Sequence, residues 1–433
     1  MGTTLFDELK PNRNLGYLTF LTSMGIFMDG FSLSIFSVAL LYLEYSFLKT
    51  PFEISLGASA IYFGMLIGSL IFGYLSDLLG RRIMYILDLT ITSAFLFLTA
   101  FSTNLLEFFI FQFFAGIGIG ADYPIAASIQ AEFSPRFVRG KYLVINMLSW
   151  TFGALVLYTL SIPIVLWGGN YAWRLMYIVG AVIPMIVVIF RSKIPESPYW
   201  LLKEGRDSEA SKISKKFANT NSNIDFPPIE KGSSNIKDLR KYMPLVIFTS
   251  VAWFSYDVSS YGVWNYTPSL FSNYNSYTMS VISTIIETVP VILGTIFCLT
   301  YVDKIGRRNL QSFGFLFAGL ALLLFAIIFM HSTMPFLMIF TAFALMHFFH
   351  NIGPTNLTYL YPPEVYPTKI RGIGMGIATA SSRVGAILGV FVFPLIISKL
   401  NVSFGLMFFA LFEFLGFTVT ILLAPETKLK HLS

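Results

Sequence analysis

The sequence is poor in charged residues. Only 12% of its 433 residues are Asp, Glu, Lys or Arg, whereas charged residues make up about 25% of a typical soluble protein. So few charges cannot cover the surface of a soluble protein of this length, and 55% of the residues are hydrophobic. The composition argues against a soluble enzyme, a nucleic-acid binder and a disordered scaffold, and it indicates a polytopic membrane protein.

Cysteine and histidine are also scarce. Cys298 is the only cysteine, which excludes an intramolecular disulfide framework and leaves the redox compartment open. Two of the four histidines, His347 and His350, are spaced i, i+3, but no nearby Cys or carboxylate completes a metal-binding set. We therefore expect ordinary helix contacts for both histidines, and the sequence predicts no metal and no cofactor.

Long apolar runs take the place of the missing polar surface. A helix needs about 20 mostly apolar residues to cross the hydrocarbon core. The first run is too long for a signal-peptide core and carries a central Asp29, so we expect it to be retained. The runs predict an all-α polytopic membrane protein with twelve transmembrane helices, near residues 16–43, 54–76, 83–101, 105–131, 141–166, 172–190, 243–270, 279–301, 309–330, 335–361, 372–398 and 403–423.

The longest polar stretch divides these runs into two sets of six. It covers residues 191–242, and its segment Ser208–Phe217 has the composition of a short surface helix. We predict a linker here, between an N-terminal six-helix bundle over residues 1–190 and a C-terminal bundle with a short tail over residues 243–433.

Lys and Arg are distributed unequally between the two sides of the predicted membrane protein. Only Lys49, Arg174 and Lys399 lie in the odd-numbered loops, and Arg383 lies within a run; the others, of 29 in all, lie in the termini, the linker and the even-numbered loops. Positively charged loops stay in the cytoplasm. We therefore expect a multi-pass protein of the cell (plasma) membrane with both termini in the cytoplasm, and the net charge of +6 requires no nucleic acid.

Three short patterns occur once in each half. One such match would carry little weight, but three in the same order indicate a duplicated six-helix unit in parallel orientation, which is an architecture of transporters. The paired segments are Asp77–Arg82 with Asp303–Arg308, Glu132–Gly140 with Glu364–Gly372, and Pro195–Ser197 with Pro425–Thr427.

These repeated Asp-x-x-Gly-Arg-Arg, Glu-x-x-Pro and Pro-Glu-Ser/Thr signatures resemble those of the major facilitator superfamily. The resemblance implies two six-helix bundles that move about a central site. Arg side chains at the cytoplasmic ends of the helices can bind carboxylates and helix-end carbonyls, which predicts a gate that breaks on opening. The alternative is that these charges only set topology and loop shape. The predicted gate residues are Asp77, Arg81, Arg82, Glu132, Arg139, Glu196, Asp303, Arg307, Arg308, Glu364, Arg371 and Glu426.

Ionisable residues within the runs are costly in lipid and usually functional. Trp253, Asp257 and Tyr261 recur every fourth residue and so share one helical face. Asp257 could exchange a proton and pair with Arg383. Competition between the proton and Arg383 for the Asp257 carboxylate would couple proton flow to solute binding. The alternative is a fixed structural ion pair. Glu287 and Glu413 have no identifiable partner in the sequence.

Within the superfamily, four segments are similar to the phosphate:proton symporters: Asp29–Phe31, Gly120–Pro124, Trp253–Tyr261 and Ala380–Gly385. The resemblance implies a proton route and an anion site. The sequence departs from that branch at Trp150, where a Gln is expected, at Arg383, where Lys is usual, and at Asp88, where the branch has Glu. After Gly353-Pro354 comes Thr355, and Asn356 stands one place late. Trp150 could line a site for an organic anion. The predicted proton-coupling residues are Asp29, Asp88, Asp122 and Asp257, and the predicted substrate-binding residues are Tyr123, Trp150, Trp253, Asp257, Tyr261, Thr355, Asn356 and Arg383.

The sequence thus predicts a monomeric, alternating-access transporter that couples protons to a small anion, phosphate first and an organic carboxylate next, with no enzymatic activity. A sugar:proton symporter is the alternative, because the cytoplasmic motifs resemble sugar porters equally well. An intramembrane aspartyl protease would explain Tyr256-Asp257, but Gly118–Asp122 has one residue too many for the second protease motif. A nutrient sensor would need a signalling tail, and only Pro425–Ser433 follows the last run.

Overall fold

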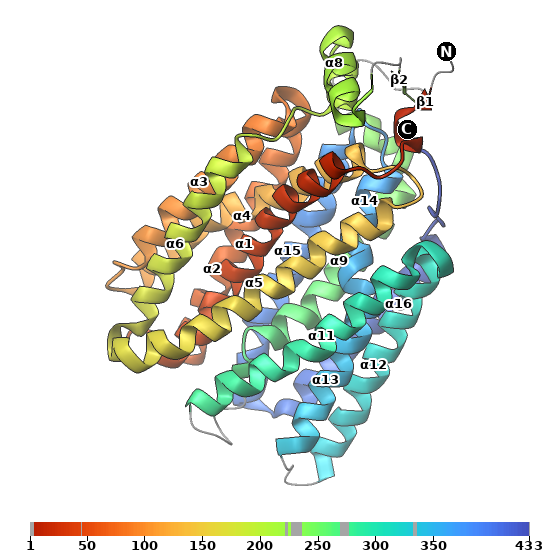
Figure 1. Ribbon diagram of the computed structural model, residues 1–433. Helices are drawn as coiled ribbons and strands as arrows, with labels where there is room; N and C mark the ends of the chain where they lie inside the picture. Colours follow the sequence, from red (N-terminus) through yellow and green to blue (C-terminus); the bar gives the residue numbers. More distant parts are fainter. Residues whose placement is uncertain are drawn as a thin grey trace.

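The computed structural model describes residues 4–44, 46–220, 224–226, 236–268, 277–331 and 336–432. Long helices run side by side through its whole length, and both termini lie at the same end, which we call the terminal side (Figure 1). The helices of the first half are α1 (Arg13–Leu43), α2 (Pro51–Leu79), α3 (Arg81–Thr99), α4 (Leu105–Phe133), α5 (Arg139–Gly168) and α6 (Ala172–Arg191).

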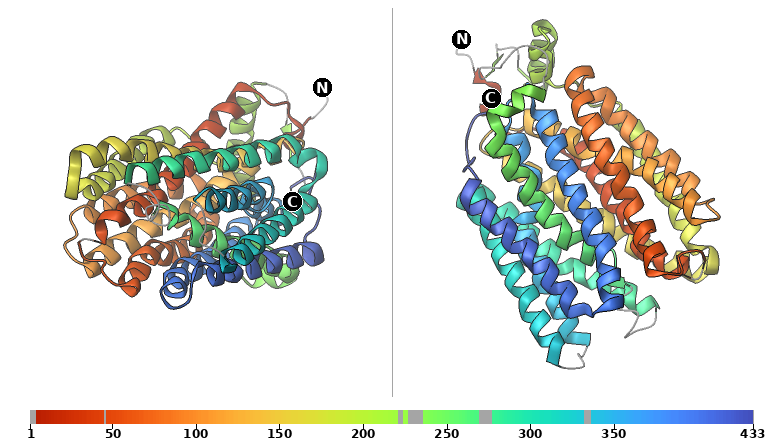
Figure 2. Two further views of the ribbon diagram at one scale, coloured as in Figure 1. Left: turned by 90° about the horizontal axis from the view of Figure 1, so that it is seen from below. Right: turned by 180° about the vertical axis from the view of Figure 1, so that it is seen from behind.

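The second half repeats this arrangement. Its helices are α9 (Met243–Trp264), α11 (Tyr277–Ile305), α12 (Arg307–His331), α13 (Phe336–Ile352), α14 (Pro354–Val365), α15 (Arg371–Lys399) and α16 (Val402–Leu423). The two halves lie side by side in both views of Figure 2. They meet mainly where α2 packs on α15 and α5 packs on α11.

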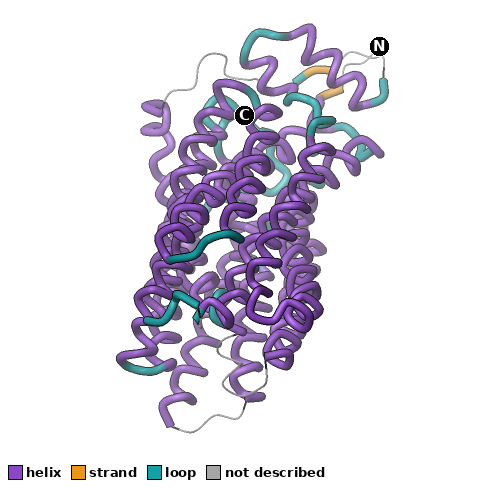
Figure 3. The backbone as a smooth tube through the Cα atoms, turned by 90° about the vertical axis from the view of Figure 1, so that its left-hand side faces the viewer, coloured by secondary structure: helices purple, strands orange, loops and turns teal. Residues whose placement is uncertain are grey.

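Short elements gather on the terminal side. They are α7 (Pro198–Lys203), α8 (Asp207–Ala218), the parallel pair β1 (Thr4–Leu5) and β2 (Ile224–Asp225), and the 3-10 turns Phe6–Glu8 and Ile236–Tyr242. A third 3-10 turn, Gly169–Tyr171, lies at the other end of the molecule, directly after α5. Figure 3 places the two strands beside the N-terminus. The surface helix predicted over Ser208–Phe217 is present as α8, and the linker residues 221–223 and 227–235 lie outside the described residues.

Nine helical stretches of the described chain are long and apolar enough to cross a membrane. One of them, Arg139–Arg191, covers both α5 and α6. The polar face of α9 keeps that helix out of this set, and residues 269–270 of the predicted run 243–270 lie outside the described residues. The apolar stretches therefore account for ten of the twelve predicted runs, and the polar α9 occupies an eleventh.

The predicted run 335–361 is not one helix. The chain breaks at Gly353, between α13 and α14, because Pro354 has no N–H to donate and its ring clashes with the preceding turn. The run is therefore a broken helix, and its first predicted residue, 335, lies outside the described residues. Broken helices at membrane depth occur where the freed backbone is buried in protein or lines a cavity.

Two equivalent glycines of the repeated motifs make tight turns between helices. Gly80 joins α2 to α3 with φ of 103°, and Gly306 joins α11 to α12 with φ of 101°. Because this region of backbone space is unfavourable for residues with a Cβ, glycine is required at both turns. The Arg that follows each glycine is thereby set at the first position of the next helix on the terminal side.

Candidate functional site

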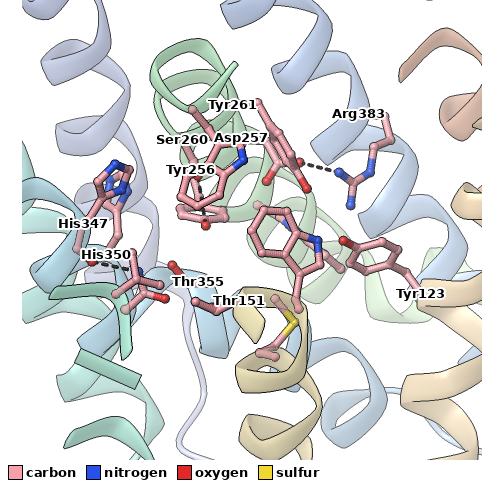
Figure 4. Close-up of a pocket in the computed structure, with 16 residues that line it drawn as sticks. Tyr123, Thr151, Tyr256, Asp257, Ser260, Tyr261, His347, His350, Thr355 and Arg383 are labelled. Atoms are coloured by element: carbon pink, nitrogen blue, oxygen red, sulfur yellow. Dashed lines mark hydrogen bonds and ion pairs between the residues drawn. The ribbon is translucent and has the colours of Figure 1, made fainter. Parts of the chain in front are cut away.

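A cavity lies between the two halves at the middle of α9. Its lining comes from α4, α5, α9, α11, α13, α14 and α15 (Figure 4). Its volume is about 30 Å³, which is room for about two water molecules. A solute larger than that can enter only if the halves move apart.

The predicted face of α9, on which Trp253, Asp257 and Tyr261 recur every fourth residue, lines this cavity. Seven of the eight predicted substrate residues line it: Tyr123, Trp150, Trp253, Asp257, Tyr261, Thr355 and Arg383. Asn356 is not part of the lining. Its amide instead donates a hydrogen bond of 2.6 Å to the backbone oxygen of Asn351. One step along a helix turns the side chain by about 100°, so Thr355 faces the cavity and Asn356 satisfies the broken end of α13.

Arg383 is the charged centre of the cavity. Its Nη1 lies 3.2 Å from Oδ2 of Asp257, and its guanidinium lies over the rings of Tyr123 and Tyr261, at 4.6 and 5.4 Å from the ring centroids. Both charged side chains are 1% exposed. The Nε atom of Arg383 has no hydrogen-bond partner in the described part of the chain. Arg383 therefore holds Asp257 and keeps a donor available for a ligand.

A second charge cluster lies beside the cavity in the first half. Arg191 binds Asp88 at 2.5 Å and Asp122 at 2.7 Å, and all three side chains are fully buried. The guanidinium also stacks on the ring of Tyr85, 3.6 Å from its centroid. Since Tyr123 follows Asp122 in α4 and lines the cavity, the cluster and the cavity are neighbours.

Sequence reasoning missed Arg191, because it is the last residue of α6 and was assigned to the linker. Side chains in a helix tilt toward its N-terminus. At the terminal-side end of α6 that direction points back into the bundle, so a residue at the predicted boundary reaches the buried acids. The sequence holds no signal that singles it out, because Lys193 follows two residues later and both residues resemble ordinary linker charges.

Asp29 is fully buried on α1, one turn after Gly25. Gly25 faces the cluster, since a Cβ placed on it would lie 2.5 Å from Oδ2 of Asp122. Neither carboxylate oxygen of Asp29 has a hydrogen-bond partner among the described residues. The predicted proton-coupling acids Asp29, Asp88 and Asp122 therefore lie on the same side of the first half, outside the cavity lining, whereas Asp257 lies in it.

Buried ion pairs hold the two halves together on the terminal side. Glu132 binds Arg81 at 3.2 Å within its own half and Arg371 at 2.9 Å across the interface. Asp77 pairs with Arg81 at 2.6 Å and accepts hydrogen bonds from the backbone N–H groups of Gly372 and Ile373, at 3.2 and 2.9 Å. These contacts close the terminal side of the interface.

The second half carries a copy of this network. Arg307 binds Asp303 at 2.9 Å and Glu364 at 3.0 Å. Asp303 faces Gly140 of the first half, where an added Cβ would lie 2.7 Å from its Oδ1. Arg139 donates to the backbone oxygen of Lys430 at 3.2 Å, and not to a gate carboxylate.

The remaining predicted gate residues act within one half. Glu196 accepts from the backbone N–H groups of Arg81 and Arg82 at the start of α3, and Glu426 does the same for Arg307 and Arg308 at the start of α12. Burial raises the pKa of Glu196, against these hydrogen bonds, which lower it. Arg82 and Arg308 cap helix ends through the carbonyls of Ser192 and Ile421.

On the side opposite the termini the halves also touch. Asn265 donates to the hydroxyl of Tyr62 at 2.9 Å, and the indole of Trp264 donates to Ser34 at 3.4 Å. The rings of Tyr62 and Tyr261 lie 5.1 Å apart. The cavity is therefore enclosed between two layers of contacts that join the halves.

Glu413 has a partner that the sequence did not reveal. It accepts a hydrogen bond from Ser259 and lies 2.9 Å from Nε2 of His350. Glu287 lies 3.9 Å from Nε2 of His347. Both histidines line the cavity, on the wall away from Arg383 (Figure 4).

Comparison with known proteins adds the family and the fold. Residues 18–433 match the model of the family described as Sugar (and other) transporter. The chain is 27% identical over 424 residues to the inner membrane metabolite transport protein YgcS of Escherichia coli, covering 98% of this chain and 94% of the relative. It is 26% identical over 471 residues to "Probable inorganic phosphate transporter 1-6" of Arabidopsis thaliana, covering 95% and 91%.

Among solved structures, the chain is similar to the proton:xylose symporter XylE of the major facilitator superfamily bound to 6-bromo-6-deoxy-D-glucose. The TM-score is 0.82 at 21% identity, over 96% of this chain and 97% of the other. This likeness confirms the predicted fold class, twelve membrane helices in two six-helix bundles. The names of these proteins give different solutes, so similarity to them does not identify the substrate.

Proposed function

The chain belongs to the sugar (and other) transporter family, and from that premise we propose that it is a proton-coupled symporter of a small anion. It is a transporter and not an enzyme. Inorganic phosphate is the first candidate substrate and an organic carboxylate the next. The terminal side faces the cytoplasm, the membrane is the cell membrane, and one chain is the working unit.

The observation that carries the choice of an anion is Arg383. A guanidinium stays ionised at any physiological pH and presents donors in a fork that matches phosphate or carboxylate oxygens. Here it is buried in the cavity, shares one carboxylate at 3.2 Å and keeps Nε without a partner in the described structure. An anion that binds Arg383 gains a charge-assisted contact in a site closed to bulk water.

Proton coupling follows from the pairing of Arg383 with Asp257. When the anion binds Arg383, the carboxylate of Asp257 loses its counter-charge, and an unpaired carboxylate at this depth is costly. Uptake of one proton by Asp257 removes that cost. When the anion leaves, Asp257 releases the proton and pairs with Arg383 again, so anion and proton move together. Asp29, Asp88 and Asp122 provide further proton-accepting groups in the first half.

Alternating access requires the two layers of interface contacts to open in turn. On the cytoplasmic side, Arg371 must leave Glu132, and the backbone of Gly372 and Ile373 must leave Asp77. Both carboxylates keep a partner within their own half after separation, since Asp77 and Glu132 both bind Arg81. Their charges are therefore not stranded when the gate opens, which lowers the barrier to opening.

Sugar:proton symport is the second candidate, supported by the family description. A sugar carries no charge and has no need of Arg383 or of its pairing with Asp257. The aromatic lining, which includes Trp150 and Trp253, is compatible with either a sugar ring or an organic anion. The two functions therefore differ in whether transport requires the positive charge at position 383.

The test is uptake into proteoliposomes that contain the purified chain under an imposed pH gradient. Labelled phosphate, a panel of carboxylates and a panel of sugars are compared in the same preparation. The proposal expects accumulation of phosphate or a carboxylate that stops when a protonophore collapses the gradient. Accumulation of a sugar with no anion accumulated would contradict it and establish the second candidate.

A further inference from the structure

The second half holds a pair of buried groups that the proposed coupling between Asp257 and Arg383 does not use. His350 lies on α13 with its Nε2 2.9 Å from Oε1 of Glu413 on α16. Their side chains are 1% and 0% exposed. Ser259 on α9 donates to the same carboxylate oxygen, which fixes the position of Glu413 from a third helix.

The other ring nitrogen of His350 is unused. Nδ1 is buried and has no hydrogen-bond partner among the residues that the structure describes, and His350 lines the cavity. A carboxylate on one nitrogen of an imidazole fixes the orientation of the ring and stabilises the imidazolium. The ring thus has one nitrogen held by Glu413 and one free to take a proton from the cavity.

The charge of Glu413 requires a counter-charge. It makes no ion pair with Lys or Arg in the described chain, and its second oxygen, Oε2, has no hydrogen-bond partner there. An ionised carboxylate at this depth is costly unless a cation is next to it. An imidazolium at His350 is the cation that the structure can supply.

We propose that His350 and Glu413 form a second proton-binding site of the transporter, which opens on the cavity through Nδ1 of His350. With one proton, the pair holds it between Nε2 and Oε1. With a second proton on Nδ1, the pair becomes an imidazolium–carboxylate pair without net charge. Proton binding here needs no movement of Arg383, so it is separate from the exchange at Asp257.

The surroundings of the pair allow this assignment. The ring of Tyr256 meets that of His350 edge to face at 5.2 Å, and α12 approaches Glu413 with Gly319, which carries no charge. From α14, the uncharged Thr355 shares the cavity wall. Among the described residues, the other titratable or charged groups around the pair or across the cavity are Tyr123 from α4, Tyr256, Asp257 and Tyr261 from α9, Glu287 from α11, His347 from α13 and Arg383 from α15.

A looser pair one turn away provides a matched control. His347 lies three residues before His350 on α13, and its Nε2 is 3.9 Å from Glu287 of α11. This distance exceeds that of a hydrogen bond. Removing the charge of Glu287 therefore changes the carboxylate content of the wall while leaving the contact between His350 and Glu413 in place.

The experiment is nitrogen-15 NMR of histidine-labelled protein in lipid nanodiscs, recorded between about pH 5 and pH 9 with no solute present. The chain has only four histidines, and the His350→Gln variant identifies the signals of His350. We expect these signals to convert reversibly between the one-proton and two-proton forms in this range. In Glu413→Gln, we expect the proton affinity of His350 to fall at least about tenfold, whereas Glu287→Gln leaves it unchanged.

The result that overturns the inference is a His350 ring that stays in one form across the range, or one that responds equally in both Gln variants. Should His350→Gln not fold, the signal that moves in Glu413→Gln and not in Glu287→Gln identifies His350 instead. The measurement is independent of the substrate, so a failure of phosphate uptake does not affect it. Conversely, an unresponsive His350 removes this site even if phosphate transport is established.

Discussion

Gly25 of α1 lies directly against the guanidinium of Arg191 at the end of α6. A Cβ built at position 25 would be 1.8 Å from Nη2 of Arg191, and it would also meet Asp122 and Tyr85 at 2.5 and 2.8 Å. No real Cβ contact is that short, so the glycine is required by the cluster. The close packing of α1 against the buried charges of α3, α4 and α6 depends on the absence of a methyl group at position 25.

The first prediction concerns that methyl group. Gly25→Ala must displace Arg191 from its acids, and overpacking of this kind costs about 1–3 kcal/mol. We expect a lower melting temperature for the purified protein in detergent and reduced uptake in proteoliposomes. The control is Gly16→Ala on the same helix, where nothing lies within 4 Å of the added Cβ. Equal melting temperatures for the two variants would contradict the packing argument.

Sequence periodicity predicted the parts of the site that lie on single helices. Trp253, Asp257 and Tyr261 share a face because the α-helix repeats every 3.6 residues, and all three line the cavity. The twelve runs were identified by their length and composition. The break at Gly353 was missed because an apolar run hides a proline that interrupts the hydrogen bonding.

Contacts between helices could not be read in the same way. His350 and Glu413 are far apart in sequence and come together only when α13 packs near α16. Arg191 was placed in the linker because a residue at the end of a run carries no sign of the direction in which its side chain points. Pairing across helices depends on how each helix is rotated and tilted against its neighbours, and the periodicity of a single helix does not specify this.

The second prediction concerns Asp257. Asp257→Asn keeps the shape of the side chain but removes the proton-binding group and the negative charge opposite Arg383. We expect loss of pH-driven accumulation, while exchange of labelled for unlabelled anion across the membrane continues, because exchange needs no net proton movement. Counterflow and gradient-driven uptake are measured in the same proteoliposomes. Retention of full gradient-driven accumulation would show that Asp257 is not the coupling group.

The third prediction concerns the terminal-side gate. Glu132→Gln removes the charge that holds both Arg81 and Arg371, so the terminal side should open more often. Its readout is the rate at which a water-soluble maleimide labels Met147→Cys, a cavity position on α5, in a Cys298→Ser background. We expect faster labelling with Glu132→Gln. Glu209→Gln, which disturbs only an exposed pair with Arg206, is the control and should leave the rate unchanged.

The fourth prediction separates an anion site from a structural ion pair at Arg383. Arg383→Lys keeps a positive charge near Asp257, whereas Arg383→Ala removes it. A charge-assisted hydrogen bond contributes about 1.5–3 kcal/mol, and each 1.4 kcal/mol is a factor of about ten in affinity. If Arg383 binds the anion, we expect Arg383→Lys to retain more phosphate uptake than Arg383→Ala, with the apparent affinity of the alanine variant reduced about 10- to 100-fold.

A purely structural pair leads to a different pattern. Removing Arg383 alone would then strand the buried carboxylate of Asp257, and the double variant Arg383→Ala/Asp257→Asn would recover both stability and uptake, because neither charge is left unpaired. If Arg383 binds the anion, the double variant recovers stability but not uptake. Melting temperature and phosphate uptake of the two single variants and the double variant therefore decide between the two roles, and recovery of uptake would refute the assignment of Arg383 to the anion.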